Sequence, residues 1–228
     1  MKKIFSILVL CLFLCGCSTE EKDATHQLKT EGNDAPRISL MINSYEEFEQ
    51  FLSFIDNDLI SDGINKRDDY GDIYHKDICV PKLCAKEIKK AVDKCGYPSF
   101  DDVKEVEKYS VQIVYPGILI NENDERFVLP IDIYSVDFAK NGLFFSINYY
   151  QKNFTNETVA FEDFKYADTA EVDGLKIDLF FSEKNHRLYS KLLSINDEYN
   201  MQIAVSMNNS NEKISADMLN FDGIHLFK

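Results

Sequence analysis

The first 17 residues of the chain combine a short basic head with an almost unbroken apolar run. Lys2 and Lys3 supply the charge, residues 4–14 are nearly all apolar, and the small residue Gly16 follows. A helix that spans a bilayer needs about 20 apolar residues, so this run is too short to be a transmembrane segment. The pattern is typical of a secretory signal peptide. We therefore expect residues 1–16 to be removed and the remainder to fold outside the cytoplasm.

The end of this stretch, Leu14-Cys15-Gly16-Cys17, resembles the lipobox of bacterial lipoproteins, with Leu at −3, Gly at −1 and Cys at +1 of the cleavage site. The resemblance covers residues 1–17 only. It implies cleavage before Cys17 and diacylglyceryl modification of that cysteine. The two or three acyl chains of a lipoprotein, palmitate among them, anchor it stably. The resemblance thus implies a protein anchored to the cell membrane on its extracytoplasmic face, with Cys17 as the lipidation site.

The segment that follows is polar and charged. Residues 17–37 contain Gly32 and Pro36, and Leu28 is their only large aliphatic residue. Such a stretch buries too little apolar surface to offset the entropy lost on ordering, so we expect a lipidated flexible tether. Twenty residues of coil span about 25 Å root-mean-square. No second low-complexity break follows, and residues 38–228 are therefore expected to form a single α+β globular domain, with two closely packed subdomains as the alternative.

The chain is strongly acidic, with 39 Asp and Glu against 25 Lys and Arg and a net charge of −14. Loss of Lys2 and Lys3 with the signal peptide leaves 23 basic residues and a mature charge of −16. Such a protein is repelled by nucleic acid and by anionic lipid surfaces. We therefore expect no nucleic-acid partner and attachment to the bilayer through Cys17 alone, together with an unknown envelope protein or ligand as partner.

Three of the six cysteines lie in residues 1–17, so the mature domain holds three, Cys79, Cys84 and Cys95. An odd number leaves at least one free thiol or an intermolecular bridge. Cys84 and Cys95 would lie about 16 Å apart on one helix, too far for a disulfide. We favour three buried thiols that pack as small hydrophobes, and a Cys79–Cys84 disulfide remains open.

Metal and nucleophile patterns are weak. The three cysteines and His75 form a legitimate zinc ligand set, but they lack the C-x₂-C spacing that makes such an assignment strong. A nucleophilic pair of Cys79 and His75 has no identifiable third residue to orient it. An EF-hand loop that starts at Asp58 fails, because Ile60 occupies its third position, where an oxygen ligand is needed. A looser calcium site at Asp56, Asp58 and Asp62 stays open but is less favoured than a solvated acidic loop. We therefore predict neither a cofactor nor a metal site.

Helical periodicity marks two segments in the first half of the domain. Ser44 and Glu47 form a capping-box pattern before apolar residues at helical spacing. A second helix is expected over residues 80–94, with Pro81 near its first turn and an apolar stripe on one face. The residues of that stripe are Cys84, Ile88, Ala91, Val92 and Cys95.

From Tyr109 onward the apolar period changes to two, which is typical of strands. Asn141-Gly142 is the strongest hairpin signal, and Asp173-Gly174 is a further turn. Short strands at hairpin spacing favour an antiparallel arrangement over βαβ units. The predicted fold class is α+β: N-terminal helices, then an antiparallel β meander of about six to eight strands, then a short C-terminal helix around residues 212–220.

The familiar catalytic spacings are missing from the sequence. There is no G-x-G-x-x-G, P-loop, G-x-S-x-G elbow or H-E-x-x-H. Two hypotheses follow. The favoured one is a non-enzymatic, surface-tethered binding or interaction domain whose site is a sheet face or edge. The alternative is an extracytoplasmic hydrolase or metal-dependent enzyme, which would show convergent carboxylates in a pocket or His75 beside a cysteine.

Overall fold

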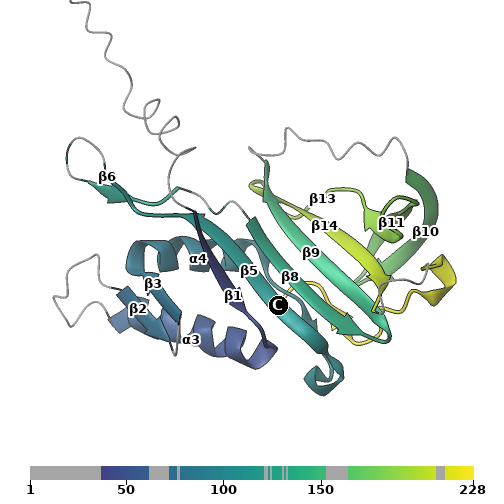
Figure 1. The fold of residues 1–228 in the computed structure, drawn as a ribbon, viewed down its shortest axis with the longest axis horizontal. Helices are drawn as coiled ribbons and strands as arrows, with labels where there is room; N and C mark the ends of the chain where they lie inside the picture. Colours follow the sequence, from purple (N-terminus) through teal and green to yellow (C-terminus); the bar gives the residue numbers. More distant parts are fainter. Residues whose placement is uncertain are drawn as a thin grey trace, which may run out of the picture.

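The computed structural model describes residues 37–61, 72–75, 78–120, 123, 125–129, 131, 133–152, 164–208 and 214–228 (Figure 1). Its largest element is an antiparallel sheet of nine strands with the order β1-β5-β8-β9-β14-β12-β11-β10, in which β13 also pairs with β14. The bounds are β1 (Arg37–Ile42), β5 (Glu107–Pro116), β8 (Ile133–Lys140), β9 (Leu143–Gln151), β10 (Phe164–Val172), β11 (Leu175–Ser182), β12 (Arg187–Ser190), β13 (Leu193–Ser194) and β14 (Tyr199–Met207).

Two α-helices and three small ladders complete the described chain. The helices are α3 (Tyr45–Ser61) and α4 (Lys82–Cys95), and 3-10 turns occupy η1 (Val103–Glu105) and η4 (Ala216–Met218). Among the described residues, neither α-helix combines the length and apolarity that a membrane span requires. The ladders pair β2 (Asp72–His75) with β3 (Ile78–Pro81), β6 (Leu119–Ile120) with β7 (Arg126–Phe127), and β4 (Ser99–Phe100) with β15 (Ile224–His225).

Local rules account for both helices. The Ser44 hydroxyl accepts a hydrogen bond from the backbone N–H of Glu47 at 3.0 Å, as an N-cap should. The apolar face of α3 is buried, with Phe48 and Ile55 both at 0% exposure. In α4 the whole predicted stripe is buried. The helices contact each other and lie together at the β1–β5 end of the sheet (Figure 1).

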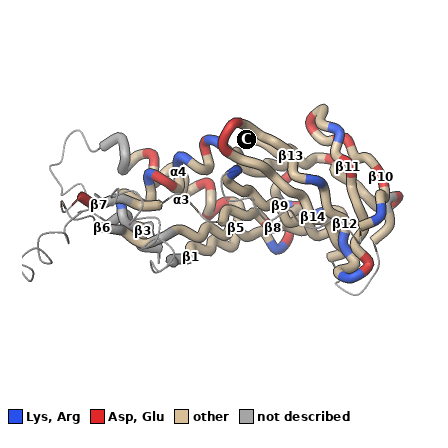
Figure 2. Tube along the Cα trace, turned by 90° about the horizontal axis from the view of Figure 1, so that it is seen from above, with Lys and Arg blue, Asp and Glu red and all other residues tan. Residues whose placement is uncertain are grey.

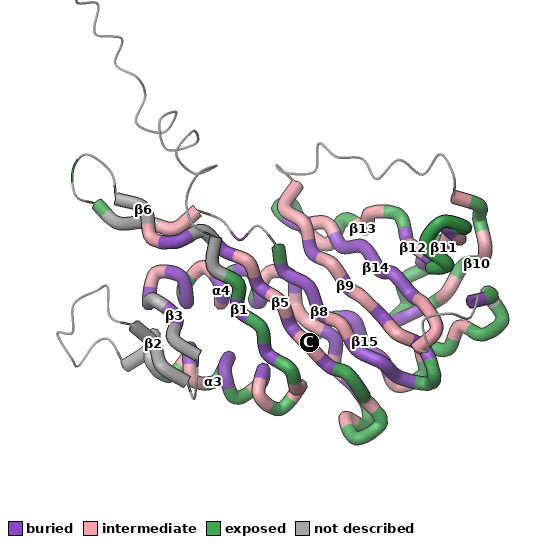
Figure 3. The backbone as a smooth tube through the Cα atoms, in the orientation of Figure 1, coloured by how far each residue is buried: buried purple, intermediate pink, exposed green. Residues whose placement is uncertain are grey.

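Tight turns set the register of the sheet. Asn141 and Gly142 have φ values of 55° and 77°, and Asp173 and Gly174 have 51° and 76°. Positive φ at both central residues defines the type I′ turn that matches strand twist. The predicted hairpins are therefore confirmed at both places. Along β9 buried and half-buried residues alternate (Figure 3), so that one face of the strand points into the core.

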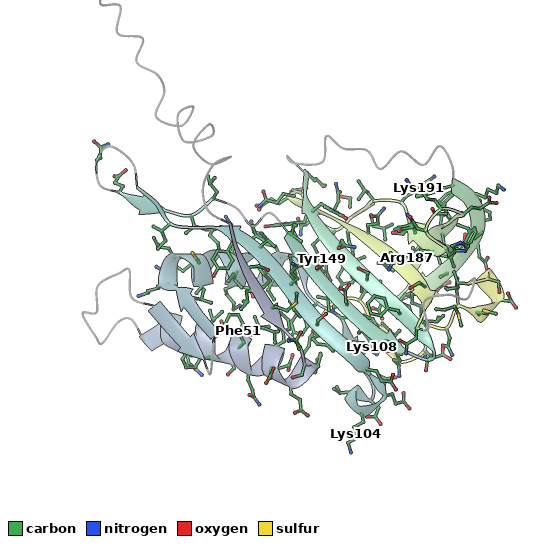
Figure 4. The ribbon with its side chains drawn as sticks, viewed as in Figure 1. Phe51, Lys104, Lys108, Tyr149, Arg187 and Lys191 are labelled. Carbon is green, nitrogen blue, oxygen red and sulfur yellow. The ribbon has the colours of Figure 1, made fainter. Side chains whose placement is uncertain are left out.

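We call the face of the sheet that carries this buried set the inner face. Its residues pack against the helices and against one another: Tyr134 stacks on Tyr149 with ring centroids 4.6 Å apart, and its hydroxyl donates to the Gly96 carbonyl at 3.0 Å. Phe51 of α3 and Tyr149 of β9 lie in this interior (Figure 4). Both helices lie on one side of the sheet (Figure 2).

The α+β class with an antiparallel sheet is confirmed, but the sheet is not a simple meander. β5-β8-β9 and β10-β11-β12 are two three-stranded meanders, and β14 lies between them. Burial explains why this late strand takes a central position: residues 201–205 of β14 are buried without interruption, and a strand with both faces covered belongs in the middle of a sheet. The pairing is non-local, so hairpin signals did not reveal it.

One strand is interrupted and one further expectation is corrected. Residues 187–195 form two short strands, β12 and β13, because the Ser190 hydroxyl accepts the N–H of Ile203 at 2.9 Å and replaces a ladder bond. The predicted C-terminal helix appears in the described residues only as the 3-10 turn η4. Beyond it, Asn220 accepts the N–H of Asp222 and Gly223 has a φ of 64°, which is turn chemistry rather than helix chemistry.

The buried stripe of α4 gives a stability prediction. Ile88→Ala should lower the free energy of unfolding by about 2–5 kcal/mol, because Ile88 has 0% exposure and its truncation leaves a cavity. Lys86→Ala, on the exposed face of the same helix, should change stability by about 0.5 kcal/mol or less. Urea denaturation of the two variants measures the difference. Equal losses would contradict the assignment of the buried face.

Candidate functional site

The inner face is too wide for the helices to cover. Seven strand spacings of about 4.8 Å make the sheet about 34 Å wide. A helix pair is about 20 Å across, and α3 with 17 residues is about 25 Å long. The rest of the apolar face therefore needs another cover.

Residues 214–228, which we call the C-terminal segment, provide that cover. Ile224 and Leu226 are buried, and Phe221 packs on Phe145 of β9 with ring centroids 5.4 Å apart. The segment ends beside α4: the N–H of Lys228 donates to the Tyr97 carbonyl at 3.0 Å. Figure 2 shows the C-terminus on the side of the sheet that carries the helices.

An apolar groove of ≈ 380 Å³ remains where the C-terminal segment meets the β11 and β13 strands. Two large hydrophobic side chains at this groove are exposed, Leu175 at 42% and Phe227 at 37%. Met201, at 0% exposure, belongs to the same lining. The lining residues are Leu175, Lys176, Leu193, Ser194, Ile195, Met201 and Phe227.

Each wall of the groove is fixed by a local structure. Leu175 follows directly on the type I′ turn at residues 173–174. Leu193 pairs with Met201 across the β13–β14 ladder. The N–H of Ile195 donates to the Tyr199 carbonyl at 3.1 Å. The groove is thus built from backbone that turns and strand pairing hold in place.

A histidine clamp joins the two strips of chain that carry Leu175 and Phe227. Nδ1 of His225 lies 2.9 Å from Asp173 Oδ1, and Nε2 lies 3.0 Å from Asp101 Oδ1. The N–H of Leu226 donates to the other Asp173 oxygen at 2.6 Å. We call His225 with Asp101 and Asp173 the His225 clamp. It ties the C-terminal segment to the β10–β11 turn and to the end of β4.

The clamp favours the imidazolium form. A neutral imidazole donates from one nitrogen only, whereas both nitrogens of His225 face carboxylate oxygens. The hydrogen bond to Asp101, followed by that to Asp173, raises the pKa of His225 above its ordinary value. The same logic applies nearby: hydrogen bonding to Glu49 raises the pKa of Lys228.

On its other side the clamp borders an acidic groove of ≈ 860 Å³. Its carboxylates come from the β10–β11 hairpin and the C-terminal segment, namely Asp168, Glu171, Asp173, Asp217 and Asp222. In the part of the chain that the structure describes, no three Asp, Glu, His or Cys side chains are arranged to hold a metal ion. The two grooves therefore differ sharply in character, one apolar and one acidic.

The residues singled out from sequence lie elsewhere. Cys84 and Cys95 are buried on α4, and burial raises the pKa of the Cys95 thiol to about 12, which is unsuited to a nucleophile. Asp56 lies on α3, which extends to Ser61, and contacts Lys89 at 3.4 Å instead of belonging to a loop. Cys17 and Asp62 lie outside the described residues, as do the side chains of His75, Cys79 and Asp58.

Sequence reasoning missed the groove because its walls come from four separate segments. Leu175 and Phe227 are 52 positions apart in the chain and meet only when the C-terminal segment folds back over the sheet. His225 meets Asp101 and Asp173 for the same reason. The one available signal was the Asp173-Gly174 turn, which marks where Leu175 begins a strand.

Comparisons with known proteins give no relative from which a role can be transferred. No protein-family model, no curated protein sequence and no solved structure matches the chain.

The His225 clamp predicts a pH dependence of stability. Because the pKa of His225 is raised in the folded protein, its contribution is complete below about pH 6.5, the unfolded value, and disappears as pH rises through the folded pKa. The melting temperature of wild type should therefore exceed that of His225→Gln most at pH 6, and the gap should narrow toward pH 9.

His186→Asn is the matched control. His186 lies in the exposed β11–β12 turn with a φ of 52°, which Asn tolerates. Its melting temperature should follow that of wild type at every pH between 6 and 9. If the difference in melting temperature between wild type and His225→Gln stays constant or widens as pH rises, the contacts of His225 with the two carboxylates are not charge-assisted.

Proposed function

We propose that the chain is a membrane-anchored extracytoplasmic lipoprotein whose folded part acts as a surface binding domain, with the apolar groove as its binding site. The observation that carries the binding role is the exposure of Leu175 and Phe227 around a groove of ≈ 380 Å³. Ligand pockets fall in the range of about 300–1,000 Å³. Two large apolar side chains left open to water in one place are costly unless something covers them in use.

The anchoring role rests on residues 1–17. The basic head, the apolar run and Leu14-Cys15-Gly16-Cys17 support lipidation at Cys17. β1 begins at Arg37, where the proposed tether ends, and β1 is the edge strand opposite β10. The groove, lined by β11, β13 and the C-terminal segment, is thus placed toward the end of the sheet away from the attachment point. This arrangement suits a site that faces outward from the membrane.

Charge supports the same function. The acidic excess of the chain keeps its body off anionic headgroups, so that only the lipid would hold it at the bilayer. β9 and β14, in the middle of the sheet, carry no charged residue, whereas β10 and β11 at its edge carry several (Figure 2). The alternative, an extracytoplasmic hydrolase or metal-dependent enzyme, is favoured by the carboxylates that gather in the acidic groove. Among the described residues, however, no three such side chains are arranged to hold a metal ion.

The lipid anchor is tested by two neighbouring cysteines. In a bacterial host, metabolic labelling with an alkyne fatty acid should label the wild-type chain and leave Cys17→Ser unlabelled. Cys15→Ser removes a thiol two positions earlier and should still be labelled, because only the +1 cysteine is acylated. Labelling of Cys17→Ser would overturn the proposed anchor.

The binding role is tested with the uncharged dye Nile red and the mature chain, residues 17–228 with Cys17→Ala so that no lipid is attached. Phe227→Asp and Leu175→Asp should each weaken dye binding by about tenfold or more, since each removes most of a buried apolar contact. Met41→Asp is the control, because Met41 is 49% exposed on β1, at the opposite edge of the sheet. Dye binding that is absent, or that falls equally in all three variants, would contradict the proposed site.

A further inference from the structure

The side of the sheet that faces away from the helices, which we call the outer face, carries a block of polar residues in its middle. Tyr134 and Tyr149 point inward, where they stack and where Tyr134 bonds to the end of α4, so their neighbours along each strand point outward. Twelve outward positions on β5, β8, β9 and β14 form three rows across the strands, and we call them the outer patch. The rows are Ser110, Asp137, Ser146 and Ala204; Gln112, Ser135, Asn148 and Gln202; and Val114, Ile133, Tyr150 and Asn200.

The outer patch is almost free of charge in a strongly charged chain. Asp, Glu, Lys and Arg make up 28% of the sequence, but Asp137 is the one charged residue among these twelve. Hydroxyl and carboxamide side chains predominate, namely Ser110, Ser135, Ser146, Gln112, Asn148, Asn200 and Gln202. Such a surface offers no cation to an anionic ligand and only one carboxylate to a cationic one. Charge complementarity therefore favours an uncharged ligand.

Much of the hydrogen-bonding capacity of the patch is unused. A carboxamide carries two N–H donors and an acceptor oxygen. Gln112 donates one long hydrogen bond to Ser39 at 3.5 Å, and Asn148 donates one to Ser146 at 3.4 Å. In the part of the chain that the structure describes, no group donates to the side-chain oxygen of either amide. These amides are free to pair with hydroxyl groups, which both donate and accept.

Strand preference does not explain the polar residues of the patch. Asn and Asp are depleted in strands, yet Asp137, Asn148 and Asn200 occupy β8, β9 and β14 in the middle of the sheet. Asp137 is also only half-buried, but its Oδ1 is closed to water and has no hydrogen-bond partner among the described residues. An unpaired carboxylate oxygen of this kind lowers stability. Residues that break local rules in this way are expected at functional sites.

The composition of the patch distinguishes a glycan from a protein partner. Protein interfaces are enriched in aromatic residues, Met and Arg at their core and depleted in Ser and Ala. The patch has three serines and one alanine, whereas Tyr150 is its single aromatic residue and Met and Arg do not occur in it. A sugar ring suits such a surface better, because its hydroxyls pair with amides and its apolar C–H face packs on an aromatic ring.

We infer that the outer patch binds an uncharged glycan. Asn148 is diagonal to Asp137 in the β8–β9 ladder, a separation of about 7–8 Å, and Tyr150 lies two positions from Asn148 on β9. Hydroxyls of the glycan donate to the carboxylate of Asp137 and pair with the amide of Asn148, while a ring packs on Tyr150. This site lies on the face opposite to the apolar groove and is independent of it.

The test is affinity electrophoresis of the mature chain without its lipid, in native gels that contain hydroxyethyl cellulose, dextran, galactomannan or laminarin. At least one of these neutral polysaccharides should retard the chain. Asp137→Asn keeps the size of the side chain and should weaken binding about tenfold or more, the value of a hydrogen bond to a charged group. Asp197→Asn is the matched control, because Asp197 is exposed in the β13–β14 turn, and it should leave binding unchanged.

A second substitution separates binding from folding. Thr is favoured in strands and Asn is depleted, so Asn148→Thr should not lower the melting temperature, whereas affinity should fall about two- to tenfold. Ser206→Thr, on the outer face of β14 outside the patch, should leave affinity unchanged. A lower melting temperature without a loss of affinity in Asn148→Thr would make Asn148 a structural residue and overturn its role.

Three outcomes would overturn the inference and leave the apolar groove untouched. The first is the absence of retardation by all four polysaccharides. The second is a steep loss of affinity between about 0.1 M and about 1 M salt, which would indicate an ionic partner. The third is self-association of the mature chain that Asn148→Thr abolishes, which would assign the patch to a second copy. Leu175→Asp, which tests the apolar groove, should leave polysaccharide binding unchanged, so the two proposals fail separately.

Discussion

A wide sheet with one apolar face is the constraint on which the rest of the structure depends. Its inner face spans about 34 Å. α3 and α4 lie at the β1–β5 end (Figure 1), and only the last turn of α4 reaches farther, where Asn196 donates to the Lys94 carbonyl at 2.7 Å. The remaining apolar residues of β9, β14 and β12 need a cover that the helices do not reach. The C-terminal segment takes this part, and the groove lies where its cover stops at Phe227. The groove therefore exists because the apolar face of the sheet is wider than the helices and the C-terminal segment that cover it.

The cover is held by polar contacts at defined points. With one 3-10 turn and a two-residue strand, the C-terminal segment has few backbone ladder bonds of its own. It is fixed instead at three places: Phe221 on Phe145, the His225 clamp, and Lys228, which contacts both carboxylate oxygens of Glu49 at 3.0 Å. Exposed ion pairs are individually weak, so the buried residues Ile224 and Leu226 supply most of the attachment and the clamp sets its position.

The local features of the fold can be predicted from the sequence, and the non-local ones cannot. The Ser44 cap, the α4 stripe and the turns at Asn141 and Asp173 obey rules that act over a few residues, and each is present. The central position of β14 depends on how well it tolerates burial on both faces compared with the other strands. The apolar period within β14 alone does not reveal this comparison. The C-terminal segment does not form the predicted helix because Asn220, Asp222 and Gly223 favour turns. The groove could not be predicted for both reasons, because its position depends on the order of the strands and on the path of the C-terminal segment.

The His225 clamp and the groove share the same backbone, so we expect the protonation state of His225 to affect the spacing of the groove's rims. Asp173 precedes Leu175 by two residues and His225 precedes Phe227 by two, so each rim residue lies within about 7 Å of chain from a clamp residue. The backbone hydrogen bond from Leu226 to Asp173 holds the two rims together, and the contacts of the His225 ring add to it. When His225 loses a proton, one ring nitrogen turns a lone pair toward a carboxylate oxygen, and the attraction on that side becomes repulsion. Linkage is reciprocal, so if the groove binds a ligand as proposed, we expect a ligand that fits the clamped width to raise the pKa of His225 further, and protonation of His225 to favour that ligand.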